Sequence, residues 1–336
     1  MNKTEQIFVV GSGRSGTTMM GRILGNHSQV FTFNEIHFLG WLSSTAKMHQ
    51  HLSKQQAVAL LSELLAIQED GIFLKKDPKN FYAKAESCLQ EKENLQEVAV
   101  YKLFLETITA ENNGQVACEQ TPKNIFYINE LLKAFPDAKF IHMVRDSRDV
   151  LLSQKNKWKR RFLGASKIPL KEAIRSYMNY HPITSAKFWK SAVEHGGKME
   201  NHSRVLQVKF EDVLMHSEKE IKTICEFLGL EFEEKIMAVP NIGSSTEEDK
   251  EGELKIDQSK ISKWKKGGLN NAEIFLAQLI SKKIMTTYQY PLKHFTFPPI
   301  CVIFYLFTFP IKAGLALLLN LKRIGNISEM IKQRFG

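Results

Sequence analysis

Two short stretches of the sequence carry residues that could bind phosphate groups. The first, GSGRSGTT, spans residues 11–18 and follows the apolar run at residues 7–10. Its glycines and hydroxyl residues have the spacing of a phosphate-binding loop, but Thr17 stands where nucleotide-triphosphate enzymes have a lysine. Such a loop between a strand and a helix directs backbone N–H groups and the helix dipole toward an anion. The cation near it is Arg14, three residues before Thr17.

The second stretch, FIHMVRDSRDVLLS, spans residues 140–153. It predicts a buried strand with Arg145 at its carboxyl end, and Ser153 about two helical turns further on. A guanidinium with a hydroxyl beside it suits a phosphate group. The alternative is an arginine that pairs with Asp146 or Asp149 at the start of a helix. Two phosphate-type motifs at two strand ends favour the ligand-binding interpretation.

These motifs belong to a chain in which short apolar runs alternate with helical patterns. The predicted strands are residues 7–10, 30–33, 116–118, 139–144 and 205–208. This alternation predicts an α/β fold, a three-layer sandwich with a mainly parallel central sheet and a P-loop-like strand–loop–helix. Both motifs then lie at the carboxyl ends of strands, where such folds bind ligands.

Longer stretches between and after the strands have weaker patterns. Residues 36–88 and 261–288 are predicted to be helical, and the polar residues 243–253 are predicted to form a mobile loop. We expect the insertions at 36–88 and 159–189 to shape the pocket of a second substrate.

The composition limits the class of protein. A chain of 336 residues with 43% hydrophobic residues is typical of one large globular domain, and its net charge of +10 favours an anionic partner. The four cysteines form no CxxC pair, which predicts reduced thiols and no zinc site. The basic residues lack interleaved aromatic residues, so we expect no nucleic-acid binding. The short stretch before residue 7 leaves no room for a signal peptide, which predicts a cytoplasmic location.

A ligand with a 5′-phosphate, a separate ribose phosphate and no γ-phosphate would suit both motifs. 3′-Phosphoadenosine 5′-phosphosulfate (PAPS) has these groups. The pair GSGRSGTT and VRDSRDVLLS resembles the two cofactor motifs of the PAPS-dependent sulfotransferase family, nearest to its tyrosylprotein and bacterial members. Two more segments, FEDVLMHSEKEIKTICEFLGL at 210–230 and SKWKKGGLNNAEI at 262–274, also resemble the family. The resemblance covers roughly residues 5–290.

The resemblance implies a role for each matching residue. The 5′-phosphosulfate would be held by the loop, and the 3′-phosphate by Arg145 and Ser153. Lys263 matches a lysine that reaches the cofactor in the tyrosylprotein enzymes. The implied cofactor-binding residues are therefore Gly13, Arg14, Ser15, Gly16, Thr17, Thr18, Arg145, Ser153 and Lys263.

Sulfuryl transfer to a hydroxyl needs a base for the acceptor proton and donors for the charge on the leaving phosphate. Glu35 is the predicted base, at the end of the second strand, and Arg14 is the predicted stabiliser. His37 is the rival base, whereas His142 is interpreted as a core histidine. No metal is expected, because a sulfuryl group carries less negative charge than a phosphoryl group. PAPS would be the donor and the bisphosphate PAP the product.

Three positions depart from the family pattern. Gln120 in the segment EQTP stands where the family usually has a lysine, and Lys123 follows three residues later. Phe210 replaces a common tyrosine, and the segment KKGG at 265–268 differs from the Arg-Lys-Gly loop of cytosolic sulfotransferases. These departures bear on the contacts to the transferred group and to the 3′-phosphate.

The chain is predicted to consist of a sulfotransferase domain, residues 1–292, and a hydrophobic and basic segment, residues 293–336. Residues 295–321 are strongly apolar, but Pro310 and Lys312 interrupt them. A spanning helix needs about 20 apolar residues. With the basic, amphipathic tail after residue 321, the segment reads as an in-plane or re-entrant membrane anchor. The alternative is a helix that packs on the domain.

These observations predict a sulfotransferase that moves a sulfuryl group from PAPS to a hydroxyl of a carbohydrate, glycolipid or other membrane-associated acceptor. We expect it to be cytoplasmic, with a peripheral position on the cytoplasmic face of a membrane. Two alternatives remain at this point. One is a P-loop kinase or NTPase, and the other is an inactive membrane scaffold on the same fold.

Overall fold

A computed structural model describes residues 6–72, 76–92, 95–163, 165–241, 245–247, 250–321 and 333. At its centre lies a five-stranded sheet in the order β2-β3-β1-β4-β5, and every neighbouring pair is parallel. The strands are β1 (Gln6–Gly11), β2 (Val30–Thr32), β3 (Val116–Glu119), β4 (Lys139–Val144) and β5 (Val205–Lys209). The predicted α/β class and the five strand positions are confirmed.

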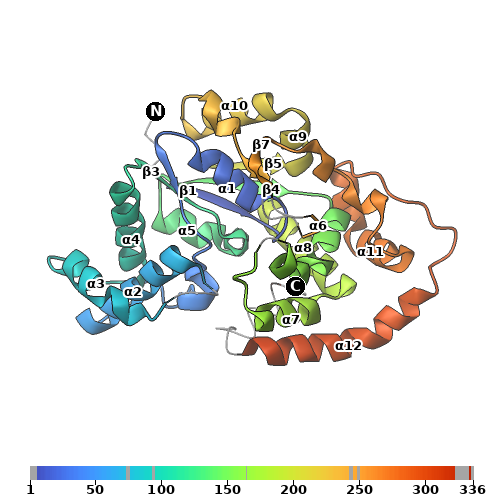
Figure 1. The fold of residues 1–336 in the computed structure, drawn as a ribbon, viewed down its shortest axis with the longest axis horizontal. Coiled ribbons are helices and arrows are strands. Elements are labelled where there is room, and N and C mark those ends of the chain that lie inside the picture. The colour runs from blue at the N-terminus through green and yellow to red at the C-terminus, as the bar shows by residue number, and fades with distance from the viewer. Residues whose placement is uncertain are drawn as a thin grey trace.

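Both faces of the sheet are covered by helices (Figure 1). Alternate residues of β1 point to opposite faces, so Phe8 and Val10 belong to one core, and Ile7 and Val9 to the other. The first core includes residues of α2 (Lys54–Asp70), α4 (Glu97–Glu111) and α5 (Ile128–Ala134). The second includes residues of α1 (Thr17–Gly25), α9 (Phe210–Met215) and α10 (Ser217–Leu228). The result is the predicted three-layer sandwich.

The predicted helical stretch at 36–88 is only partly correct. After β2 the chain forms one π-helical turn at Phe38–Leu42, in which Gly40 has φ 93°, and then leaves helical geometry until Ser53. The Ser53 hydroxyl accepts a hydrogen bond from the Gln56 N–H and begins α2 with a capping box. The helix α3 (Tyr82–Leu89) follows. The apolar spacing indicated helix, but it did not reveal this break.

The predicted helix at 261–288 is shorter than expected. A 3₁₀ turn at Lys263–Lys266 is followed by Gly267 and Gly268, both with positive φ, before α11 (Asn271–Thr287) begins. The polar stretch at 243–253 is not entirely loop. Residues 250–254 form β7 (Lys250–Leu254), which pairs antiparallel with β6 (Pro240–Asn241).

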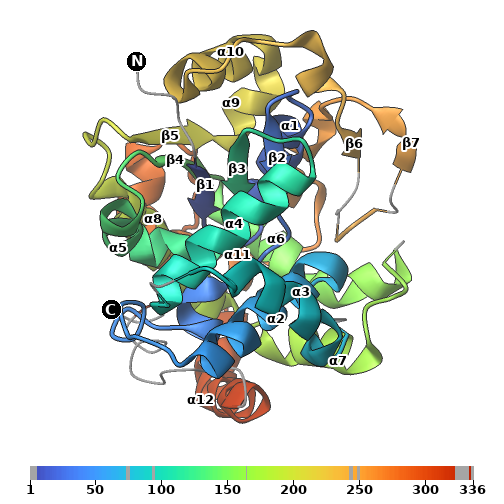
Figure 2. The same cartoon turned by 90° about the vertical axis from the view of Figure 1, so that its left-hand side faces the viewer.

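Four further helices surround the carboxyl edge of the sheet. They are α6 (Ser147–Lys155), α7 (Leu170–Asn179), α8 (Pro182–Gly197) and α12 (Cys301–Asn320). Figures 1 and 2 both show α12 at one end of the molecule, beneath the other helices. It runs without a break through Pro310, although proline removes one backbone hydrogen bond.

A buried arginine ties α6 to α11. The Arg148 side chain is fully buried, and its guanidinium pairs with Asp146 at 2.6 Å. It also donates to the Gln278 side chain at 3.0 Å and to the Pro291 carbonyl at 2.7 Å, and it stacks on Trp264. These contacts fix the first turn of α6, which directly follows the predicted phosphate ligand at position 145.

We predict that Arg148→Ala lowers the free energy of unfolding by about 3–5 kcal/mol, because it leaves the Asp146 carboxylate buried without its partner. Denaturant titration would measure this loss. Lys222→Ala is the matched control, because it removes the exposed pair with Glu218 and should cost about 1 kcal/mol or less. Equal losses for the two variants would contradict the structural role of Arg148.

Candidate active site

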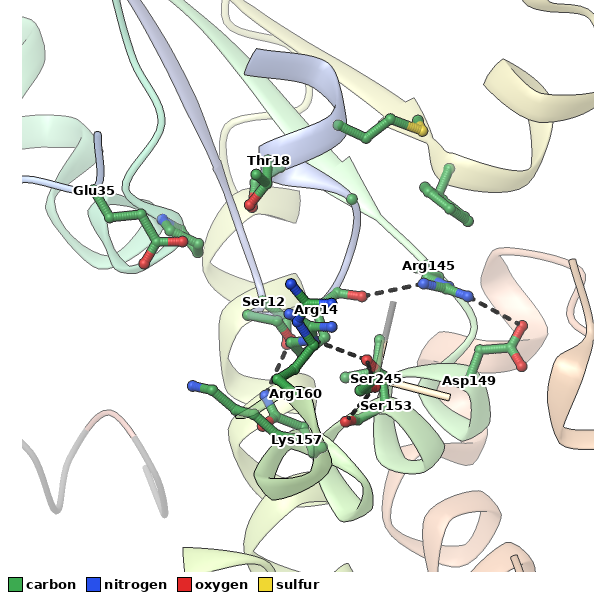
Figure 3. A pocket seen from close by; sticks show the side chains of 18 of the residues that line it. Ser12, Arg14, Thr18, Glu35, Arg145, Asp149, Ser153, Lys157, Arg160 and Ser245 are labelled. Atoms are coloured by element: carbon green, nitrogen blue, oxygen red, sulfur yellow. Dashed lines mark hydrogen bonds and ion pairs between the residues drawn. The ribbon is translucent and has the colours of Figure 1, made fainter. Parts of the chain in front are cut away.

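A cavity of about 730 Å³ opens at the carboxyl edge of the sheet. Its walls come from the segments that follow β1, β2, β3 and β4, together with the first residue of α9 (Figure 3). A volume of this size is typical of small-molecule sites. Apart from Ser15, every predicted cofactor-binding or catalytic residue lines this cavity.

The loop between β1 and α1 has the geometry of an anion cradle. Gly16 has φ 96° and precedes the first turn of α1, and a Cβ at this position would overlap the Phe210 ring. Arg14 also has a positive φ, of 75°. Thr17 is buried and Thr18 is exposed to the cavity, so only the Thr18 hydroxyl is fully accessible to a ligand. The Gly13 carbonyl accepts a hydrogen bond from Gln154.

Ser15 is placed differently from the prediction. Its side chain is fully buried, its hydroxyl has no hydrogen-bond partner among the described residues, and it does not line the cavity. Its backbone N–H donates to the Ser12 carbonyl at 3.1 Å. The loop folds back on itself at this residue, so the Ser15 hydroxyl points into the protein.

Arg145 lies at the end of β4, as predicted. Its guanidinium stacks on the Phe210 ring at 4.2 Å and donates to the carbonyls of Arg14 and Lys260. Asp149 lies 3.9 Å away, so the ion pair considered as the alternative is also present. Phe210 lacks the hydroxyl of a tyrosine, but its ring still provides the surface on which Arg145 is held.

The two predicted phosphate motifs meet directly. Arg14 Nε donates to Ser153 Oγ at 2.8 Å, and Ser153 Oγ lies 2.9 Å from Ser245 Oγ. Figure 3 shows Arg14, Ser153 and Ser245 next to one another among the residues that line the cavity. The Arg14 side chain therefore links the loop after β1 to Ser153, a predicted 3′-phosphate residue. Burial, together with the positive charges of Arg145 and Arg160, lowers the pKa of Arg14 to about 10.

Lys263 lines the cavity from the 3₁₀ turn before α11, as the resemblance implied. Its ammonium group pairs with Glu247 and donates to the Thr246 hydroxyl at 3.1 Å. Lys260 pairs with the same carboxylate. Lys263 therefore reaches the cavity wall as one half of a charged pair.

The two candidate bases form a pair. His37 Nε2 lies 3.3 Å from Glu35 Oε2, and the His37 ring stacks on Trp41. Burial opposes ionisation of Glu35, but the hydrogen bond with His37 and the charges of His37, Lys157 and Arg14 outweigh it and lower the pKa of Glu35. Glu35 is therefore ionised at neutral pH and can accept a proton.

A buried carboxylate that the sequence analysis missed supports this pair. Glu119, at the end of β3, is fully buried and accepts hydrogen bonds from Ile36 N–H, from Thr121 and from Asn124 Nδ2 at 2.7 Å. The Thr121 hydroxyl in turn accepts from the His37 N–H at 3.2 Å. Glu119 thus fixes the backbone on which both candidate bases stand. The segment EQTP marked this position, but nothing in it indicated a link to residues 35–37.

The departures from the family pattern also lie at the cavity. Gln120 and Lys123 line it, and the Gln120 side-chain oxygen is buried without a partner in the described part of the chain. Two cations that the sequence analysis did not single out, Lys157 and Arg160, also line the cavity, from the turn after α6. His142 is buried within β4 and packs against Gly196, as expected for a core histidine, and does not line the cavity.

The family model described as the sulfotransferase family matches residues 6–234. The chain belongs to the sulfotransferase family. Protein-tyrosine sulfotransferase 1 of Danio rerio is 23% identical over 238 residues, which are 69% of this chain and 55% of that protein. An uncharacterized protein of Aquifex aeolicus is 24% identical over 267 residues, 77% of this chain and 30% of its own length. The chain thus spans about half or less of the length of these family relatives.

Solved structures of sulfotransferase domains share the fold. The domain from the Synechococcus PCC 7002 olefin synthase has a TM-score of 0.51 at 21% identity, and covers 87% of this chain and 97% of its own. The domain from the curacin biosynthetic pathway has a TM-score of 0.52 at 18% identity, and covers 87% of this chain and all of its own. The central sheet and its flanking helices are therefore those of the family.

We predict that Glu119→Gln flattens the dependence of stability on pH. Burial raises the pKa of Glu119 from 4.5 to about 7, so the folded state keeps a proton that the unfolded chain releases. Its stabilising contribution is complete below pH 4.5 and is lost as the pH rises to about 7. Unfolding free energies measured from pH 4.5 to 8 should fall more steeply for the wild type than for the variant, by up to about 1.4 kcal/mol per pH unit.

Glu111→Gln is the control, because Glu111 forms an exposed pair with Lys84. It should leave the slope unchanged. Parallel curves for the wild type and Glu119→Gln would show that Glu119 keeps an ordinary carboxyl pKa in the fold.

Proposed function

We propose that this protein transfers a sulfuryl group from PAPS to a hydroxyl of a membrane-associated amphiphile. The observation that carries the proposal is that a single cavity is lined by the phosphate-type loop, Arg145, Glu35 and also Asn320 of the apolar helix α12. Donor-binding groups, a candidate base and the apolar helix are thus connected through one space.

The residues present fit the phosphate groups of PAPS. The Nε–H of Arg145 is buried and has no hydrogen-bond partner among the described residues, so it remains available to an anion. The loop offers the N-terminus of α1, without any acidic residue in its first turn, and the exposed hydroxyl of Thr18. Arg145 and Ser153 would hold the 3′-phosphate, and Gly16, Thr17 and Thr18 the 5′-phosphosulfate.

Glu35 supplies the base in this proposal. PAPS brings the sulfuryl group, which passes to the acceptor oxygen as the bond from sulfur to the phosphate oxygen breaks. Glu35 takes the acceptor proton, and His37 and the Glu119 network hold Glu35 in place. Arg14 and the N–H groups of the loop stabilise the negative charge that remains on the leaving phosphate. No metal is part of the proposal.

The apolar helix supports a membrane-associated acceptor. An 18-residue stretch within Cys301–Asn320 has a mean hydropathy of 2.0, and the helix meets the length and composition of a membrane-spanning segment. Several of its large apolar side chains are exposed: Ile303, Phe304, Leu306, Phe307, Ile311, Leu315, Leu318 and Leu319. Leu170, Ile174 and Tyr177 of α7, which packs against α12, are exposed as well. A contiguous apolar surface of this kind is typical of a protein or membrane contact.

The contacts of α12 favour an orientation in the plane of the membrane. Asn270 donates to the Tyr305 hydroxyl at 2.9 Å, Lys312 donates to the Tyr180 carbonyl at 3.3 Å, and Asn320 donates to Asn179 at 2.8 Å. These contacts attach one side of the helix to the domain along most of its length. A helix held in this way lies beside the domain with its opposite side facing outward. The basic tail in the prediction, residues 322–335, falls almost entirely outside the described residues.

A cytoplasmic location on the inner membrane face is part of the same proposal. The free cysteines Cys88, Cys118, Cys225 and Cys301 are consistent with a reducing compartment. Among the alternatives, a P-loop kinase or NTPase would need a lysine at position 17, where this chain has a threonine. An inactive scaffold would bind PAPS without releasing PAP.

Ligand binding tests the donor. We predict that adenosine 3′,5′-bisphosphate binds more tightly than ATP with Mg²⁺ in a calorimetric titration, and that Arg145→Ala weakens the bisphosphate by about tenfold to hundredfold through loss of charged hydrogen bonds. Glu35→Gln should bind the bisphosphate like the wild type, yet lose sulfate transfer from radiolabelled PAPS to a membrane-lipid extract. Tighter binding of ATP would overturn the proposal in favour of an NTPase.

Vesicle flotation tests the membrane contact. We predict that the wild type floats with vesicles of neutral and anionic phospholipids, and that Phe304→Ser with Phe307→Ser shifts most of it to the soluble fraction, because two large apolar groups leave the exposed face. Leu254→Ser is the control, since Leu254 is exposed on β7 and outside α12. Unchanged flotation of the double variant would exclude this face of α12 as the membrane contact.

A further inference from the structure

Lys157 is a cation that lines the cavity but has no role in the donor binding or proton transfer described above. It lies in the 3₁₀ turn Lys157–Phe162 after α6 and lines the same cavity as Glu35 and Arg14. Figure 3 shows its side chain extending into the space that Glu35 borders. Its ammonium group forms no hydrogen bond or ion pair with the described part of the chain.

Five other cations around the cavity have contacts within the protein. Arg14 is bound to Ser153, and Arg145 to Phe210 and two carbonyls. Lys260 and Lys263 both pair with Glu247. Arg160, on the same turn as Lys157, donates to the Leu163 carbonyl. Lys157, in contrast, has no such contact in the described part of the chain, and it lies on the side of the candidate base.

The electrostatics of the cavity agree with this position. The charge of Lys157 lowers the pKa of Glu35 more than the charge of Arg14 does, so Lys157 is the lysine or arginine that most favours the ionised form of the candidate base. Burial and the charge of Arg14 lower the pKa of Lys157. Gln120 lines the cavity as well, but it is neutral and cannot balance negative charge there.

We propose that Lys157 contacts the sulfuryl group of PAPS and is a further catalytic residue of this enzyme. The inference rests on the proposed function. The sulfuryl group lies between the attacking hydroxyl oxygen and the leaving phosphate oxygen. Its equatorial oxygens carry negative charge throughout the transfer. An ammonium group beside Glu35 neutralises that charge, while Arg14 and the loop serve the leaving phosphate on the other side.

The experiment compares two ligands that differ only in the sulfuryl group. We expect wild-type protein to bind PAPS more tightly than adenosine 3′,5′-bisphosphate, and Lys157→Ala to reduce that preference by about tenfold or more while its affinity for the bisphosphate stays unchanged. Lys157→Arg should retain most of the preference, because it keeps the charge. PAPS slowly releases sulfate to water, and this reaction needs no identified acceptor. We expect its rate to fall in Lys157→Ala and to stay close to the wild-type rate in Lys157→Arg.

Lys159→Ala is the matched control, since Lys159 stands on the same turn but lies over the Trp158 ring and does not line the cavity. If Lys157→Ala keeps the wild-type preference for PAPS, the inference fails even though the donor assignment stands. If the preference is instead lost in Lys123→Ala, the sulfuryl contact belongs to Lys123 and the inference is overturned. If the wild type binds neither ligand, the proposed function fails first.

Discussion

The arrangement of this site depends on the stacking of Arg145 on Phe210 beside Gly16. Three segments meet in that contact: the loop after β1, the end of β4 and the first residue of α9. Gly16 is needed because a side chain there would overlap the ring. Arg145 reaches back to the Arg14 carbonyl and so links the loop to the ring. The buried contacts of Arg148 hold α6, which begins after Arg145 and carries Ser153, against α11 and the segment that follows it.

The sequence identified what depends on local pattern. The strands, the loop geometry and the placement of Arg145 and Ser153 follow from apolar runs and glycine spacing, and the structure confirms them. The interruption after β2 escaped detection because apolar residues in an irregular segment can have helical spacing. Helix α12 passes through Pro310, which had suggested an interruption.

The parts of the site that the sequence did not reveal depend on contacts between distant residues. Glu119 and Ile36 are 83 positions apart, and their hydrogen bond exists only because β2 pairs with β3. Ser15 belongs to the motif, yet its hydroxyl turns into the core. Lys157 follows α6 by two residues and has no motif of its own. Only the direction in which the turn leaves α6 brings it to the cavity.

The attachment of α12 along the domain has a geometric consequence. Asn320 and Asn179 are hydrogen-bonded to each other and both line the cavity, so the distance between the apolar helix and Glu35 is set by the packing of α7. With α12 in a bilayer, the base would stand at one fixed height above the lipid surface. The protein would then select acceptors whose hydroxyl group projects from the membrane by that distance. Head groups that are shorter or longer would not bring their hydroxyl to the base.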